Sequence, residues 1–194
     1  KAYVANGRHD EWDRWRTMVG LGIVRAGNDL YQYYWGGGDL HDSLPLRKEM
    51  TRDPRWHNGL GLVKQRLDGF VSADVDYRGG FITTPPIVFE GNRLELNFNC
   101  GAQGTMFVEL RDLNDQPLPG YTLGDCEEVS GNDVAWVVRW RGSLDVSSLA
   151  GQPIKIHFKM QNARLYAFRF VGDDTPDFSG PSANPPLTIG PPSE

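Results

Sequence analysis

The alternation of apolar and polar residues in the second half of the chain constrains its fold more than any other feature. Apolar side chains stand at every second position in five segments: residues 94–98, 105–111, 136–140, 154–161 and 166–170. A period of two is that of a β-strand with one buried face. Gly, Pro, Asn and Asp occur between these segments, as they do in turns. The pattern therefore predicts an antiparallel β-sandwich.

Helical patterns are weak throughout the sequence. No segment keeps a helical period over three turns, and residues 145–151 predict a single helical turn between two strands. The fold class that we expect is therefore all-β. Trp136 and Trp140 fall on one strand face together with Val138, which predicts that both indole rings are in the core.

The first third of the chain carries a smaller group of strands. Residues 18–25 and 30–35 have strand character, and Ala-Gly-Asn-Asp at 26–29 supplies the Gly and Asn that a tight hairpin needs. Gly-Leu-Gly-Leu-Val at 59–63 repeats Gly-Leu-Gly-Ile-Val at 20–24. This short repeat predicts two strands with similar roles in one sheet.

The character of the chain changes along its length. Residues 36–58 predict a long irregular loop, and such loops are usually functional or contact another part of the protein. Residues 59–72 mark the change from a strand-rich segment (1–66) to the sandwich (67–172). The remaining residues, 173–194, contain six prolines. Because proline cannot donate to a β-ladder, we expect a tail or a strap here.

Composition and charge exclude two classes of function. The formal net charge is −5 and no block of Lys and Arg occurs, whereas nucleic-acid binding needs a clustered basic face. No window of about 18 apolar residues is present, so no membrane span is expected.

Metal and redox chemistry have little support in the sequence. No Cys-x-x-Cys, His-x-x-x-His or His-Glu-x-x-His spacing occurs, so we expect no metal site and no cofactor. Cys100 and Cys126 are either half-buried thiols or a disulfide. Calcium is an alternative at one acidic turn, although such clusters are usually just solvated. This turn contains Asp125, Glu127, Glu128 and Asp133.

Several short stretches together carry a family resemblance. They are residues 66–72 (Arg-Leu-Asp-Gly-Phe-Val-Ser), 80–85 (Gly-Phe-Ile-Thr-Thr-Pro), 94–97, 108–112, 117–121, 125–126, 140–142, 145–151 and 165–168. With these stretches the chain resembles the C-terminal part of five-bladed β-propeller glycoside hydrolases of the family 32 and family 43 type. The resemblance covers roughly residues 11–171 and is strongest in the sandwich. In the blade, residues 30–39 match best.

The resemblance implies a larger glycan-processing protein. Residues 1–66 would then be a terminal propeller-blade segment, and the sandwich would buttress the propeller. Those enzymes cleave glycosidic bonds with two carboxylates in the propeller funnel. Their early-blade motifs have no equivalent here, so this chain alone is not expected to be catalytic. The implied partners are a carbohydrate and the remainder of a β-propeller, in the same or another chain, and the implied location is extracellular or periplasmic.

Three residues are candidates for catalytic work. Asp13 lies in a cluster of acids and aromatic residues, a composition that sugar sites favour, although a solvated turn is the alternative. Asp39 and His41 follow three glycines just past a strand end, where a propeller places funnel-facing residues. His41 could orient a substrate hydroxyl or tune an acid. A loop-stabilising pair is the alternative for both.

Aromatic rings are candidates for stacking on sugar rings. The candidates for substrate binding are Trp12, Trp15, Tyr34, Trp35, Trp56, Phe107 and Tyr121. Phe107 falls on the polar face of its strand, which predicts an exposed ring. Packing against a propeller is the alternative for Phe107, and packing inside the blade is the alternative for Trp56.

Two other classes of function remain open at this point. The first is a non-catalytic carbohydrate-binding or assembly module that makes contact through Phe107 and Tyr121. The second is a structural subunit of an extracellular assembly that uses the proline-rich residues 173–194 as a strap.

Overall fold

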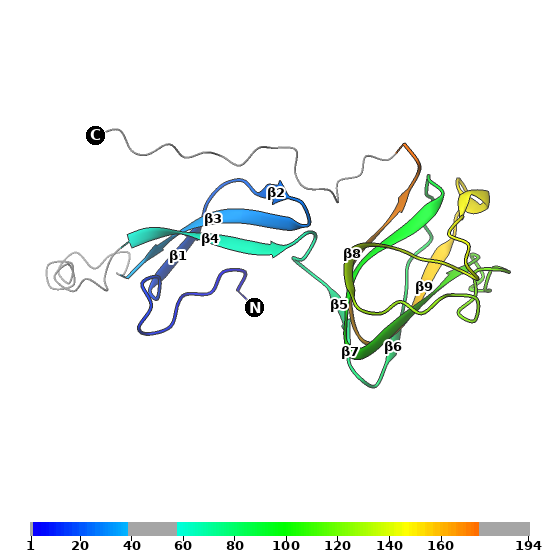
Figure 1. The fold of residues 1–194 in the computed structure, drawn as a ribbon, viewed down its shortest axis with the longest axis horizontal. Coiled ribbons are helices and arrows are strands. Elements are labelled where there is room, and N and C mark those ends of the chain that lie inside the picture. The colour runs from blue at the N-terminus through cyan, green and yellow to red at the C-terminus, as the bar shows by residue number, and fades with distance from the viewer. Residues whose placement is uncertain (1, 39–57, 175–194) are drawn as a thin grey trace, which may run out of the picture. The chain divides into compact units, whose positions relative to one another are not determined.

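The computed structural model describes residues 2–38 and 58–174, and these residues form antiparallel β-sheets (Figure 1). Within the two ranges, the one helical element is a 3₁₀ turn, η1 (Ser147–Leu149). The prediction of an all-β fold and of one helical turn is thus confirmed. No helix in this part of the chain is long and apolar enough to cross a membrane. The chain divides between Leu67 and Asp68 into an N-terminal unit and a C-terminal unit.

The N-terminal unit is an up-and-down sheet built on one central strand. Its strands are β1 (Arg16–Val19), β2 (Val24–Ala26), β3 (Asp29–Gly37) and β4 (Asn58–Arg66). β3 pairs with β4 along its whole length, and with β1 and then β2 on its other edge. The predicted hairpin is confirmed, because Ala26 pairs with Asp29 across a two-residue turn in which Gly27 has a φ of 59°.

The repeat at residues 20–24 and 59–63 does not mark equivalent strands. Residues 59–63 lie inside β4, whereas residues 20–23 interrupt the strand line between β1 and β2. Val19 pairs with Tyr34 and Val24 pairs with Tyr31, so residues 20–23 lie opposite only residues 32 and 33. The extra residues form a bulge in which Gly22 has a φ of 85°.

The C-terminal unit is one five-stranded sheet with two very long strands. Its elements are β5 (Ala73–Val75), β6 (Gly80–Thr83), β7 (Arg93–Arg111), β8 (Asn132–Val137) and β9 (Lys155–Val171). β7 and β9 pair along their whole length, from Arg93 opposite Val171 to Arg111 opposite Lys155. β5 and β6 pair with the other edge of β9, and β8 pairs with β7. Each long strand therefore contains two of the segments that the alternation predicts.

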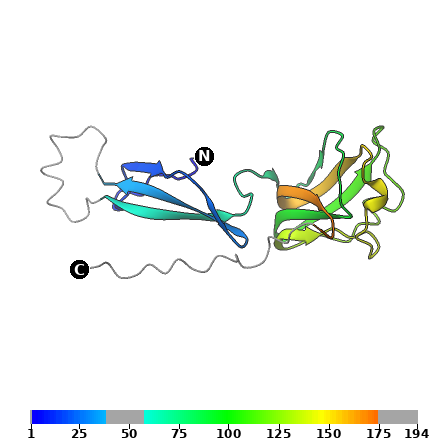
Figure 2. The same ribbon diagram turned by 90° about the horizontal axis from the view of Figure 1, so that it is seen from above.

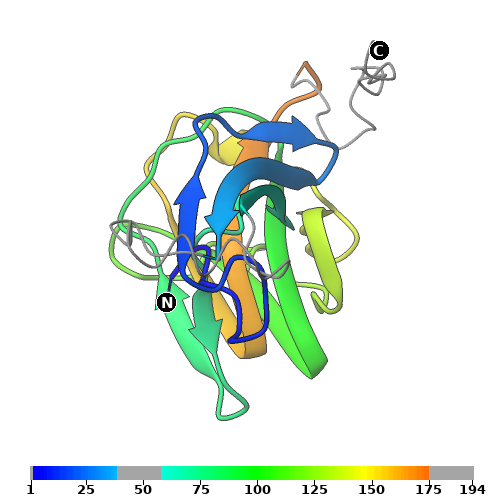
Figure 3. The ribbon, with the colours of Figure 1, turned by 90° about the vertical axis from the view of Figure 1, so that its left-hand side faces the viewer.

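The sheet is strongly curled (Figures 2 and 3), and buried side chains of its strands form one core. Leu94, Phe98, Met106 and Phe158 are fully buried there. Segments outside the strands close the core and contribute Phe89, Cys126, Val129, Val138, Trp140 and Val146. Within the described residues of the C-terminal unit, there is no second sheet to face the five-stranded one. The fold is sandwich-like because this one sheet curls and loops cover its core.

The two tryptophans of residues 136–140 occupy different environments. Trp140 is buried, and its Nε1 donates to the carbonyl oxygen of Val108 at 2.9 Å. Trp136 is 39 % exposed, so its predicted place in the core is wrong. Trp136 pairs with Leu96 and its ring meets Phe98 edge-on, with centroids 6.2 Å apart, but it stays partly open because β8 is the last strand of the sheet. Trp136 thus sits on a strand at the edge of the sheet.

The two cysteines are free, buried thiols and not a disulfide. Burial raises the pKa of each thiol to about 11. The backbone N–H of Val108 donates to Cys126 Sγ at 3.2 Å. Both thiols therefore stay protonated near neutral pH and serve as packing groups in the core.

The core argument predicts unequal effects of two Phe→Ala substitutions on neighbouring strands. Phe158→Ala removes a fully buried ring, which should lower the free energy of unfolding by about 3–5 kcal/mol. Phe81→Ala removes a ring that is 63 % exposed and should cost less than about 1 kcal/mol. Urea denaturation of the full chain measures both values. Equal losses would show that the core is not where the structure places it.

Candidate functional site

Three predicted site residues come together in the N-terminal unit. The rings of Trp12 and Tyr34 are stacked, with centroids 5.9 Å apart and planes at 21°. The hydroxyl of Tyr34 donates to Oδ2 of Asp13 at 2.7 Å. Asp13 is buried, with 8 % of its surface exposed. The fold therefore brings Trp12 and Asp13 of the acid and aromatic cluster together with Tyr34, which lies in a separate segment of the sequence.

Glycines of β3 and β4 make room for the two rings. Gly36 pairs with Gly59, and Tyr34 pairs with Gly61, so these residues share one face of the sheet. A Cβ atom at Gly36 would lie 2.6 Å from the indole of Trp12, which is a steric clash. A Cβ atom at Gly61 would clash with the ring of Tyr34. The Gly-Leu-Gly motif at residues 59–61 thus keeps this face flat enough to carry both rings.

The main chemical feature of this cluster is the hydrogen bond from Tyr34 to Asp13. The bond to Asp13, with burial and the nearby negative charges, raises the pKa of Tyr34 to about 12. Tyr34 therefore remains a donor near neutral pH and cannot act as a base. The carboxylate of Asp13 accepts this bond in a buried position, so the pair positions Trp12 and Tyr34 rather than offering an open acid.

The other predicted residues of this unit take different places. Trp35 lies on the opposite sheet face from Tyr34 because neighbouring residues of a strand alternate. The guanidinium of Arg16 stacks over the Trp35 ring at 4.3 Å from its centroid. Trp15 is 42 % exposed, with the Arg14 guanidinium 5.3 Å from its ring centroid.

Three of the predicted site residues lie outside the described residues. They are Asp39, His41 and Trp56.

Tyr121 has a structural position in the C-terminal unit. Its ring meets Trp140 edge-on, with centroids 5.4 Å apart and planes at 78°. Its hydroxyl donates to the carbonyl oxygen of Asp145 at 3.0 Å. Tyr121 is half-buried, and these contacts attach its loop to the segment before η1.

Phe107 lines an open cleft of about 400 Å³. Its ring is half-buried and packs partly against the core, so it is less exposed than the sequence predicts. We call this hollow the aromatic cleft; it is lined by Arg78, Gly79, Gly80, Phe81, Thr105, Phe107, Lys159, Met160 and Gln161. Phe81, Lys159 and Phe107 form one cross-strand row over β6, β9 and β7. The cleft therefore presents phenyl rings on both sides of a lysine.

His157 supports the exposed ring of this cleft. Its imidazole stacks on Phe81 with centroids 5.2 Å apart and planes at 18°. Its Nδ1 lies 2.7 Å from Oγ1 of Thr83. Burial lowers the pKa of His157, so the imidazole is neutral at pH 7 and adds no charge to the cleft.

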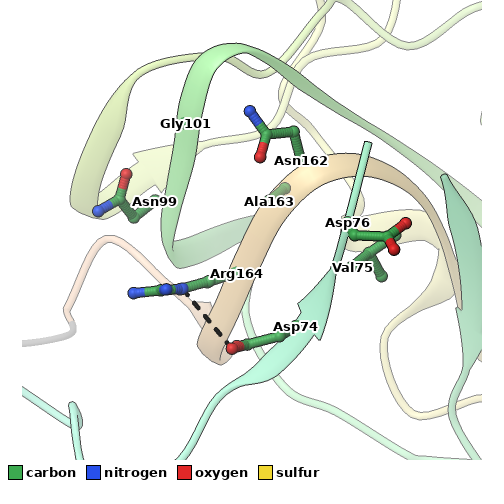
Figure 4. Close-up of a pocket in the computed structure, with 8 residues that line it drawn as sticks. All are labelled: Asp74, Val75, Asp76, Asn99, Gly101, Asn162, Ala163 and Arg164. Atoms are coloured by element: carbon green, nitrogen blue, oxygen red, sulfur yellow. Dashed lines mark ion pairs between the residues drawn. The ribbon is translucent and has the colours of Figure 1, made fainter. Parts of the chain in front are cut away.

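A second hollow of about 460 Å³ adjoins the first, and we call it the polar cleft (Figure 4). Its lining consists of Asp74, Val75, Asp76, Asn99, Gly101, Asn162, Ala163 and Arg164. Asp74, Arg164 and Asn99 form a cross-strand row over β5, β9 and β7. Arg164 Nε lies 3.6 Å from Oδ2 of Asp74. The hollow thus offers a carboxylate, a guanidinium and amides at one surface.

The linings of the two clefts have no residue in common, but they continue along the same strand and loop. Gln161 lines the aromatic cleft and the next residue, Asn162, lines the polar cleft. Likewise Arg78 and Asp76 line different clefts, and their side chains approach to 3.8 Å.

An irregularity in the β7–β9 ladder shapes this region. Cys100 pairs with Ala163 and Thr105 pairs with Gln161, so residues 101–104 project opposite the single residue Asn162. Asn162 has a φ of 46°, and its side-chain amide donates to the carbonyl oxygen of Ala102 at 2.9 Å. This bulge separates the two clefts along β9.

Sequence reasoning found Phe107 but missed Phe81, Asp74 and Arg164. In Gly-Phe-Ile-Thr at residues 80–83 two apolar residues are adjacent, so alternation alone does not say which is exposed. The pairing of Ile82 with the buried Phe158 decides it and turns Phe81 outward. Asp74 and Arg164 are far apart in sequence and meet through strand pairing.

Two acids of the turn considered for calcium, Asp125 and Glu127, accept hydrogen bonds within the protein. Oδ2 of Asp125 accepts from Oγ1 of Thr122 at 2.9 Å, and Asp125 also forms an ion pair with Arg141. The bonds from Thr122 lower the pKa of Asp125. Oε1 of Glu127 accepts from the N–H of Gly142 at 2.9 Å. In the described part of the chain, no three His, Cys, Asp or Glu side chains are grouped so that they could hold a metal ion.

Comparisons with protein-family models, curated proteins and solved structures found no match for this chain.

The Tyr34–Asp13 bond predicts a specific dependence on pH. Tyr34 has a pKa raised from 10.0 to about 12, so the folded protein holds its proton more tightly than the unfolded chain does. The stability that this bond provides is present below pH 10 and is lost as the pH rises towards 12. Near-ultraviolet phenolate titration of the parent and Tyr34→Phe gives a difference curve for this one group. We expect its midpoint well above pH 10; a midpoint at 10 would contradict the bond.

Proposed function

We propose that the C-terminal unit binds carbohydrate in the aromatic and polar clefts, as part of a glycoside-hydrolase-like protein. The observation that carries this proposal is the adjacency of two phenyl rings, exposed Phe81 and half-buried Phe107, to a hollow lined by carboxylate, amide and guanidinium groups. The proposal includes an extracellular or periplasmic location, where a protein can meet polysaccharides.

The chemistry of a sugar matches this arrangement. One face of a pyranose or furanose ring presents C–H groups that pack on an aromatic ring, as on Phe81, which is 63 % exposed. Its hydroxyls donate to carboxylates and accept from guanidinium and amide N–H groups. Asp74 and Arg164 are about equally exposed, with 58 % of each side chain accessible, so their hydrogen-bonding groups can reach a ligand.

The roles of two acids, Asp13 and Asp125, favour binding over catalysis by this chain. Asp13 is buried and accepts from Tyr34, and Asp125 is occupied by Thr122 and Arg141. A glycosidase needs two carboxylates that face the scissile bond from opposite sides. The proposal therefore assigns the catalytic carboxylates to the remainder of a β-propeller.

A specific feature favours a second role, the docking of the N-terminal unit on another β-layer. Met18, Val24, Tyr33, Leu60 and Leu62 share one face of its sheet through the pairings with β3. Each is at least half exposed, from 50 % for Leu62 to 76 % for Leu60. A small sheet with one apolar face needs a covering layer. A neighbouring propeller blade would provide one.

Carbohydrate binding predicts loss of affinity when the rings of the aromatic cleft are removed. Phe81→Ala and Phe107→Ala should each weaken binding of the full chain to a soluble polysaccharide by about tenfold, because stacking on an aromatic ring contributes about 0.5–1.5 kcal/mol beyond area burial. Affinity electrophoresis against a panel of plant, algal and bacterial polysaccharides measures this. Tyr77→Ala, a 70 % exposed ring outside the cleft lining, is the matched control. Binding that survives both cleft substitutions would remove the proposal.

The docking role predicts that the apolar face drives association of the chain by itself. We expect the parent to bind a hydrophobic dye and to self-associate, and Leu60→Lys with Leu62→Lys to suppress both with little change in thermal stability. Leu113→Lys, at a 50 % exposed turn position of the C-terminal unit, should behave like the parent. Sedimentation and dye fluorescence report the outcome. A monomeric, dye-negative parent would show that the face is already covered.

A further inference from the structure

We propose that the aromatic cleft selects an acidic glycan and binds a sugar carboxylate at Nζ of Lys159. This inference deepens the proposed carbohydrate binding and rests on it. It specifies the class of sugar through the distribution of charge around the cleft.

The cations that point away from the core along the same ladder have carboxylate partners, with one exception. Nζ of Lys155 lies 2.8 Å from Oδ1 of Asp115. Arg111 Nε lies 2.7 Å from Oε1 of Glu109. Lys159, in contrast, is exposed and has no ion pair within 4 Å among residues 2–38 and 58–174. Its ammonium charge is thus available to a ligand.

The surroundings of Lys159 make the cleft positive. No Asp or Glu belongs to its lining, and the charge of Arg78, the other cation of the lining, is offset by Asp76. The carboxylate of Asp76 lies 3.8 Å from Arg78 but lines the polar cleft. In the polar cleft itself, Asp74 is balanced by Arg164. The cleft therefore carries a local positive charge at Lys159. Because the net charge of the chain is −5, the chain as a whole is not expected to attract polyanions.

A uronic-acid residue satisfies both parts of this cleft at once. Its ring presents C–H groups to Phe81 or Phe107, and its carboxylate can pair with the lysine that lies between them in the strand register. Phenyl rings beside the ion pair exclude water and strengthen it. A neutral sugar could stack in the same place but would leave the ammonium group without a partner.

The test compares four polymers on the full chain at physiological ionic strength: polygalacturonate, fully methyl-esterified polygalacturonate, dextran and dextran sulfate. We expect polygalacturonate to bind about tenfold more tightly than its methyl ester or dextran, since a charged hydrogen bond contributes at least this factor. Lys159→Gln should remove most of this preference. Arg139→Gln removes an exposed cation elsewhere in the same unit and should leave it unchanged.

Each other outcome overturns the inference in a distinguishable way. Equal binding of dextran and polygalacturonate, both lost in Phe107→Ala, would overturn it while the proposed carbohydrate binding stands. Dextran sulfate binding as tightly as polygalacturonate would show that any anion is accepted and that a carboxylate is not selected. Equal losses in Lys159→Gln and Arg139→Gln would show unspecific electrostatic attraction. If no glycan in the panel or among these polymers binds, both proposals fail.

Discussion

The C-terminal unit depends on the pairing of β7 with β9 along their whole length. This ladder sends Phe98, Met106 and Phe158 into the core. The same register sets the outward neighbours of β9, placing Phe107 beside Lys159 and Asn99 beside Arg164. Both clefts are therefore consequences of one set of backbone hydrogen bonds, because shifting a strand by one residue would exchange its two faces.

Local departures from regular pairing give each unit its special surface. In the C-terminal unit, residues 101–104 project opposite Asn162 and separate the aromatic cleft from the polar one. In the N-terminal unit, Gly36, Gly59 and Gly61 remove side chains where Trp12 and Tyr34 lie against the sheet. Chemistry-bearing residues thus gather where the sheet is either widened by a bulge or thinned by glycine.

Alternation in the sequence was sufficient to predict the all-β fold and the hairpin at residues 26–29. It could not show that residues 94–98 and 105–111 belong to one strand, because the projecting residues 101–104 look like a turn. It also overestimated the burial of Trp136, since the periodicity cannot show that β8 is an edge strand. The polar cleft could not be predicted from the sequence, because Asp74 and Arg164 meet only through long-range strand pairing. Hydrophobic patterns specify faces well, but neighbours across strands depend on register.

The β7–β9 ladder also bears on how the chain reaches its folded state. At one end the ladder joins Arg111 to Lys155, and at the other it joins Arg93 to Val171. The first contact closes a much shorter loop than the second, so forming it loses less chain entropy. Folding is therefore expected to begin near Arg111 and Lys155 and to proceed as a zipper towards residues 93 and 171. Until this pairing is complete, the two long strands have unpaired edges and exposed apolar side chains. The chain is therefore most prone to misassembly during synthesis while β7 and β9 are pairing.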